Sequence, residues 1–327
     1  MLKISHFFIV TCATALLLGN AVQAANVMAV TGNQGDGNFD PNSFYEINTD
    51  NGRSTKIGSA TVTPNQLAYD VSSNNYYYMD HNGSNFYRFD ITNGTQHLIG
   101  DLIDVGMPSG KTGSGGGDFY NGRYYYTPET GTEGLYVISF NGDGSQIVSH
   151  TPIAPSNLSD HSDLFDGSGN AGLGDFGDFA IDSDTGLMYG SSRMSKNGQS
   201  YYAFWTIDLT DPNYEMAMLN DNISDVYQMA FDENNVLWAN RWNSGGDLYE
   251  LNKSDGTISD TATLRYINSR GRWRAANGDF YDMASTGVRE GIPVIPEPSS
   301  FAFMSTAAFL FLRRRRKPEA VLYSTLR

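Results

Sequence analysis

Cysteine is almost absent from this sequence, and the one that occurs, Cys12, lies in an apolar N-terminal segment. Beyond that segment there is no thiol for a nucleophile, a cysteine-ligated zinc site or a disulfide. The five histidines show no paired metal-ligand spacing. The sequence also lacks a G-x-S-x-G motif and a glycine loop leading into a helix, so the common serine-hydrolase and phosphate-binding signatures are excluded.

Positive charge is scarce, because the chain has 21 basic against 36 acidic residues and a formal net charge of −15. Between residues 25 and 295 there are 14 basic and 34 acidic residues, which gives this region a net charge of about −20. A field of this sign repels nucleic acid and anionic lipid and attracts cations. We therefore expect no nucleic-acid partner.

Long helical patterns are missing between Ala25 and Val294, where no apolar period of 3.6 residues is sustained. Glycine and aromatic residues are abundant instead, with 35 Gly, 20 Tyr and 18 Phe in the chain. Glycine and Asx turns between aromatic runs are typical of many short strands. The composition therefore predicts an all-β domain.

The first 24 residues form a segment of their own. Lys3 is followed by an apolar run from Phe7 to Leu18, and Val22 and Ala24 occupy the small-residue positions of a signal-peptidase site. This order predicts a cleaved helical signal peptide over residues 1–24, and a mature chain that starts near Ala25. The alternatives are a buried helix and a membrane anchor, but the apolar run is short for a membrane span.

A repeat of four short strands runs through the middle of the chain. One unit extends from Gln66 to Leu102, with strands separated by Asn, Gly, Ser and Asp. Similar units cover Gly117–Ile153, Gly177–Leu219 and Tyr227–Leu264. A four-stranded repeat of this length indicates the blade of a β-propeller.

The two ends of the repeat region complement each other. Asn26–Gly58 contains three strands of a unit without its inner strand, and Asn277–Gly287 contains an inner strand alone. Together they make a fifth blade, so we expect a propeller domain over residues 25–288, closed by pairing the C-terminal inner strand with the N-terminal strands. An up-and-down sandwich is the alternative. The insertions Ala154–Phe176 and Arg265–Asn277 are expected to be loops.

The C-terminal region has three parts in a fixed order after a linker at residues 289–295. Pro296, Glu297 and Pro298 come first, the apolar run Phe301–Leu312 follows, and four arginines come last (Arg313, Arg314, Arg315 and Arg316). A helix of twelve residues spans only about 18 Å, against about 30 Å of membrane hydrocarbon. Retained positive charge would hold such a segment at the cytoplasmic side.

This tail, residues 296–327, resembles the PEP-CTERM sorting segment of bacterial proteins that an exosortase processes. The resemblance implies recognition at Pro296–Pro298, transient membrane insertion, removal of the tail, and delivery to the cell envelope surface or the extracellular matrix. A retained C-terminal membrane anchor is the alternative.

Polar residues open the predicted inner strands, which line the central channel of a propeller. They are Gln66, Asp118, Asp178, Gln228 and Asp279, and three of them belong to Gly-Asp-Phe triplets. Three carboxylates and two amides could bind Ca²⁺, or they could be a solvated polar ring. A catalytic use of Asp118 and Asp178 requires two carboxyls about 5 to 9.5 Å apart.

Two tryptophans, Trp242 and Trp273, fall in or beside expected loops, where their rings could stack on sugar faces or cover blade edges. The sequence thus favours a secreted, surface- or matrix-sorted propeller that is a binding or structural module, associated with extracellular polysaccharide or biofilm. The alternatives are an extracellular glycan hydrolase or lyase that uses channel-mouth carboxylates, and a structural matrix protein without a discrete ligand.

Overall fold

The computed structural model describes residues 25–33, 37–110, 115–128, 134–157, 177–196, 199–225, 227–241, 246–278 and 280–286. The predicted signal peptide and the predicted sorting tail lie outside these ranges. The described residues form twenty-two strands and one short 3-10 helix, η1 (Ile103–Val105). Within the same ranges, no helix is long and apolar enough to cross a membrane.

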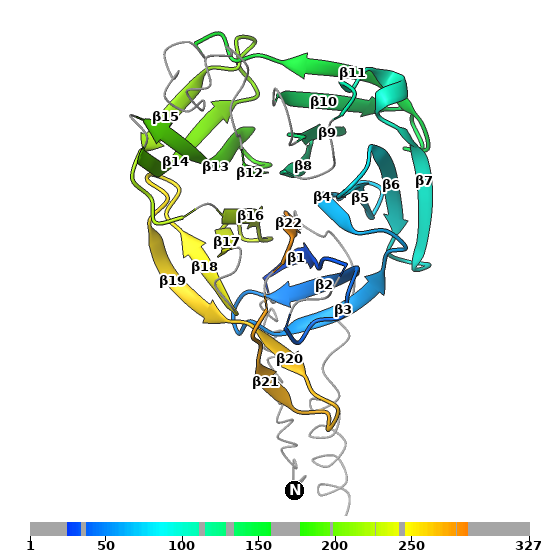
Figure 1. Ribbon diagram of the computed structural model, residues 1–327, viewed down its shortest axis with the longest axis vertical. Helices are drawn as coiled ribbons and strands as arrows, with labels where there is room; N and C mark the ends of the chain where they lie inside the picture. Colours follow the sequence, from blue (N-terminus) through cyan, green and yellow to red (C-terminus); the bar gives the residue numbers. More distant parts are fainter. Residues whose placement is uncertain are drawn as a thin grey trace, which may run out of the picture. The chain divides into compact units, whose positions relative to one another are not determined.

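Twenty of the strands form five antiparallel sheets of four, arranged as blades around a centre (Figure 1). From the centre outward, blade I contains β22 (Asp282–Ala284), β1 (Asn26–Val30), β2 (Ser43–Asn48) and β3 (Ser54–Ser59). Blade II contains β4 (Pro64–Asp70), β5 (Asn75–Asp80), β6 (Asn85–Asp90) and β7 (Thr95–Asp101).

The other three blades have the same order of strands. Blade III contains β8 (Gly117–Tyr120), β9 (Arg123–Tyr126), β10 (Leu135–Phe140) and β11 (Ile147–Ile153). Blade IV contains β12 (Asp178–Ile181), β13 (Leu187–Lys196), β14 (Gln199–Asp208) and β15 (Met216–Asn220). Blade V contains β16 (Tyr227–Phe231), β17 (Leu237–Arg241), β18 (Asp247–Leu251) and β19 (Ile258–Thr263). The predicted five-bladed β-propeller is therefore confirmed.

Successive side chains of a strand point to opposite faces of its blade, so neighbouring aromatic residues fill different seams between blades. Tyr76 and Tyr78 of β5 pack against blade I, whereas Tyr77 packs against blade III, and all three are fully buried. The turn between β8 and β9 consists of Asn121 and Gly122, with φ angles of 53° and 75°. Two positive φ values in succession are what a two-residue type I′ hairpin turn requires.

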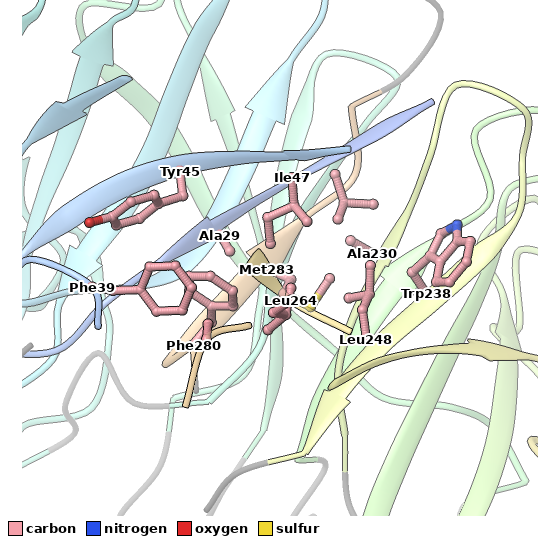
Figure 2. Close-up of a cluster of buried hydrophobic side chains, with 12 residues drawn as sticks. Ala29, Phe39, Tyr45, Ile47, Ala230, Trp238, Leu248, Leu264, Phe280 and Met283 are labelled. Atoms are coloured by element: carbon pink, nitrogen blue, oxygen red, sulfur yellow. The ribbon is translucent and has the colours of Figure 1, made fainter. Parts of the chain in front are cut away.

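The hydrophobic core is divided into five clusters, one at each seam between neighbouring blades. Figure 2 shows the cluster between blades V and I, where Trp238 and Leu248 of blade V face Ile47 of blade I. Met283 of β22 is fully buried in the same cluster. The ring thus depends on contacts between blades, and each blade buries its faces only when both neighbours are present.

The ring closes between the two ends of the propeller sequence. β22 pairs antiparallel with β1, with Met28 opposite Ala284 and Val30 opposite Asp282. The hydroxyl of Thr286 also donates to the carbonyl of Asn26 at 2.6 Å. The predicted closure, in which the C-terminal inner strand completes the N-terminal blade, is confirmed.

The insertion Arg265–Asn277 differs from its prediction, because it contains a β-hairpin where the sequence suggested a loop. β20 (Arg265–Ile267) pairs with β21 (Trp273–Ala275) as a separate two-stranded sheet. The hairpin projects from the rim of the propeller between β19 and β3 (Figure 1). Its base is joined to blade I, where the Arg265 N–H donates to the Gly52 carbonyl at 2.7 Å.

Candidate functional site

The inner strands bring most of the predicted ring residues to the centre of the propeller. Gln66, Asp118 and Asp178 are buried on β4, β8 and β12, and Gln228 is half-buried on β16. Asp279 lies outside the described residues. The inner strand of blade I begins at Asp282, which is fully buried.

Each of the three buried aspartates joins its own blade to the next. Asp178 accepts the N–H of Phe179 on its own strand at 2.8 Å and the N–H of Met229 on β16 at 2.7 Å. Asp282 accepts the N–H of Met283 at 2.7 Å and, from blade II, that of Leu67 at 2.5 Å. One carboxyl group therefore satisfies two backbone donors that belong to different blades.

Asp118 has the same arrangement and one additional donor. Its Oδ1 accepts the N–H of Phe119 at 2.8 Å, and its Oδ2 accepts the N–H of Ile181 on β12 at 2.7 Å. The hydroxyl of Ser285 donates to the same Oδ2 at 2.8 Å and itself accepts the N–H of Phe231 at 3.0 Å. Ser285 thus connects blade I to blades III and V.

The seam between blades II and III uses an amide in place of a carboxyl. Gln66 Nε2 donates to the Thr127 carbonyl at 2.8 Å, and the hydroxyl of Tyr124 donates to the Gln66 carbonyl at 2.5 Å. Gln66 has a φ of 54°, and the register between β4 and β5 shifts here. A positive φ is costly for a residue with a side chain, and it persists where the surroundings hold it.

Two glycines at the start of β8 permit the close approach of the neighbouring blades. A Cβ atom on Gly116 would lie 2.4 Å from Asp178 Oδ1, and one on Gly117 would lie 2.6 Å from the Gln66 carbonyl oxygen. Both separations are too short for a side chain. Gly116 and Gly117 therefore have a packing role at the centre.

Burial changes the protonation of the central aspartates. It raises the pKa of Asp118 to about 6, although the hydrogen bonds from Ile181, Ser285 and Phe119 lower it. Burial also raises the pKa values of Asp178 and Asp282 well above their usual range. For Asp282 the nearby charge of Asp178 raises the pKa further, since two like charges at the centre disfavour ionisation.

The contacts of the central carboxyls determine whether these groups could act as catalytic acids or bases. A glycosidase needs one carboxyl on each side of a sugar ring, separated by about 5 to 9.5 Å. Both oxygens of Asp118, of Asp178 and of Asp282 accept backbone N–H groups. The arrangement is suited to holding blades together.

The arrangement of acidic and histidine side chains was compared with what a bound cation requires. Among them, no group of three or more His, Cys, Asp or Glu side chains is arranged to hold a metal ion. The predicted Ca²⁺ set includes Asp279, whose position is not among the described ranges. That set stays a prediction.

A small pocket of about 60 Å³ lies at the C-terminal ends of the inner strands. All five blades contribute to it, through residues that include Tyr69, Phe119, Ile181, Phe231 and Ser285. Pockets that enclose a small organic ligand usually measure about 300–1,000 Å³. This pocket has room for water, which occupies about 30 Å³ per molecule, but not for a sugar ring.

Of the two predicted glycan-stacking residues, Trp273 lies on the β20–β21 hairpin, away from the inner strands. Trp273 is half-buried on β21, and the guanidinium of Arg53 lies 5.2 Å from the centroid of its ring. Trp273 pairs with Ile267 next to the turn of the hairpin, and the contact with Arg53 holds its indole beside the turn between β2 and β3. Trp242 lies outside the described residues.

Comparisons with known proteins extend the description of the fold. No protein-family model matches the sequence, and no curated protein matches it. Among solved structures, the nidogen/laminin complex is 10% identical over 80% of this chain and 97% of that chain, with a TM-score of 0.45.

Two bacterial structures show similar values. TolB from Acinetobacter baumannii is 11% identical over 80% of this chain and 66% of that chain, with a TM-score of 0.44. A gluconolactonase from Xanthomonas campestris is 14% identical over 72% of this chain and 80% of that chain, with a TM-score of 0.41. Likenesses at this level carry no conclusion about ligand or activity, so the chain is defined by its own strand pairing as a five-bladed β-propeller.

Proposed function

We propose that this chain is an exported β-propeller, sorted to the cell surface or extracellular matrix by its tail, that binds extracellular polysaccharide without altering it chemically. The observation that favours binding over hydrolysis is the use of Asp118, Asp178 and Asp282 as hydrogen-bond acceptors between blades. Carboxyls that are buried and shared in this way are poor acids and bases toward an external sugar.

The proposed destination rests on the two ends of the sequence. The segment before Ala25 has the pattern of a signal peptide, and residues 296–327 resemble a PEP-CTERM tail. The implied partners are an exosortase-type processing enzyme and, transiently, the inner membrane.

Binding and turnover are distinguished by one titration series. We expect calorimetry of the protein against a panel of bacterial polysaccharides to detect association with at least one polymer. Chromatography of the same mixtures after prolonged incubation should detect no shortened or unsaturated products. Product formation would favour a glycan hydrolase or lyase, and a panel without any association would reject the carbohydrate-binding function.

Sorting is tested by deletion of residues 296–327. We expect the shortened protein to appear in the medium, whereas the full chain is retained at the envelope or released only after proteolytic processing. Fractionation and immunoblotting measure this difference. A protein in which only Arg313–Arg316 are replaced by serine should be mislocalised too, because the cytoplasmic charge is lost. Identical fractionation of all three would remove the sorting proposal.

A further inference from the structure

The hairpin β20–β21 carries a concentration of positive charge on an acidic protein. Its eleven residues, 265–275, include four arginines and no acidic residue, whereas residues 25–295 carry a net charge of about −20. The four arginines are all exposed: Arg265, Arg270, Arg272 and Arg274. Within the described part of the chain, none of them forms an ion pair with a carboxylate.

The hairpin is held at its base and has a defined tip. Leu264 and Ala276 flank it and are buried in the seam between blades V and I. At the tip, Asn268 Oδ1 accepts the N–H groups of Arg270 and Arg272 at 3.0 and 3.1 Å. Gly271 has a φ of 67°, and its N–H donates to the Asn268 carbonyl at 2.9 Å. The arginine side chains therefore project from a fixed backbone.

Fold stability does not account for this composition. Beyond its base the hairpin buries little, and Ile267 is 54% exposed. Like charges crowded on a small sheet repel one another and lower stability. A ligand with negative charge would remove this repulsion.

We propose that this hairpin, the arginine hairpin, is the arm through which the propeller binds an anionic polysaccharide, which rests on the carbohydrate-binding function proposed above. The planar guanidinium pairs with a carboxylate through two parallel hydrogen bonds. Arg274 lies on β21, and Arg272 directly precedes this strand. The exposed Ile267 and the half-buried Trp273 supply apolar surface for sugar faces.

Two other occupants fit less well. Nucleic acid carries a phosphate charge about every 1.7 Å along a duplex, and a partner of such charge density is repelled by the acidic blades around the hairpin. A second copy would offer acidic surface, but several aspartates of that surface are already hydrogen-bonded within turns, among them the exposed Asp143 and the half-buried Asp90 and Asp255. A polyuronate combines moderate charge density with apolar ring faces.

The test compares two variants that each lose arginines. In the first, Arg270, Arg272 and Arg274 are replaced by serine, and in the second, Arg313–Arg316 are replaced by serine. Each protein is titrated with alginate as a polyuronate, with neutral dextran and with duplex DNA. We expect the hairpin variant to bind alginate about tenfold to hundredfold more weakly, since an exposed ion pair contributes up to about fivefold in affinity. The tail variant should match the natural protein within about twofold.

Three results would overturn the proposal. Alginate could bind the hairpin variant as tightly as the natural protein, it could fail to bind the natural protein, or DNA could bind more tightly than alginate at equal salt. If the natural protein binds other polysaccharides but not alginate, the proposal for the hairpin is rejected and the general carbohydrate-binding function stands. If it binds no polysaccharide of the panel, both proposals are rejected. Unchanged melting temperatures of both variants exclude a folding defect. Replacement of the same three arginines by lysine should retain part of the affinity, because the charge remains while the bidentate geometry is lost.

Discussion

A chain that ends before Phe280 is expected not to fold cooperatively. The truncation removes β22 and with it Phe280 and Met283, which are buried in the closing seam. It leaves the N–H groups of Leu67 and Phe231 without their acceptors on Asp282 and Ser285. Two large apolar side chains contribute about 1.5–3 kcal/mol each, and two unpaired buried donors cost about 1–3 kcal/mol each.

The summed loss of about 5–12 kcal/mol equals the whole stability of an ordinary domain, about 5–15 kcal/mol. Denaturant titration followed by tryptophan fluorescence measures it. The matched control ends after Thr286 and should melt like the full chain, because it keeps β22 and the contacts of Ser285. A synthetic peptide of residues 280–287 added to the shorter truncation should restore cooperative melting. Equal melting temperatures for the two truncations would show that β22 is not needed for closure.

The second large effect concerns pH. The pKa of Asp118 is raised to about 6 in the folded protein, against about 3.9 in an unfolded chain. Between these values the folded state binds the proton and the unfolded state does not, so stability falls as pH rises. The full contribution of this one group is on the order of 3 kcal/mol, since one pKa unit corresponds to about 1.4 kcal/mol.

Asp178 and Asp282 act in the same direction and extend the loss to higher pH, because their pKa values are also raised. His81 and His150 oppose it, because burial lowers the pKa of each imidazole and stability then falls on acidification below about 6.5. The contributions of Asp178, Asp282, His81 and His150 are shared by the natural protein and the variant Asp118→Asn, so they cancel when the stabilities of the two proteins are subtracted. We expect the stability of the natural protein relative to Asp118→Asn to decline by about 2 kcal/mol between pH 4 and pH 7, because the unfolded carboxyl is already about half ionised at pH 4.

Urea titrations of both proteins across this range measure the decline. Ser285→Ala serves as the second variant, because the Ser285 hydroxyl lowers the pKa of Asp118. Its removal should extend the loss of stability to higher pH. Parallel profiles of the natural protein and Asp118→Asn would show that Asp118 does not take up a proton on folding.

The blades could be predicted because their determinants are local. A turn such as Asn121–Gly122 and an alternating strand such as Asn75–Asp80 indicate their own conformations within a few residues. The repeat then placed each strand within its blade. The closure followed from counting strands at the two ends, which needs no knowledge of long-range contacts.

The register of the closing strand could not be predicted in this way. Gly-Asp-Phe occurs three times, and at Gly117 and Gly177 the triplet opens an inner strand. In blade I the inner strand begins at Asp282, which lies opposite Val30 of β1. Phe280 instead packs in the seam between blades V and I, and its N–H donates to Asn240 Oδ1 at 3.2 Å. The register of this strand is thus set by its pairing with β1, at the other end of the propeller sequence.

The hydrogen bonds at the centre of the propeller also could not be predicted from local sequence patterns. Ser285 and Asp118 are separated by 167 residues, and their hydrogen bond appears only when five blades surround one centre. The arginine hairpin was missed for another reason. Its polar composition suggested a loop, although Asn268 and Gly271 are suitable residues for a tight turn between two strands.

The pairing of β1 with β22 has a consequence for the order in which the chain is made. A ribosome adds about 5–20 residues per second, so roughly 10 to 50 s separate the synthesis of β1 from that of its inner neighbour. Throughout this interval the edge of β1 and the apolar side chains of blade I have no partner from β22. Unpaired edges of this kind recruit other strands. Blade I is therefore made first but completed last, and it is the part of the nascent chain that most needs protection by a chaperone until its final residues emerge.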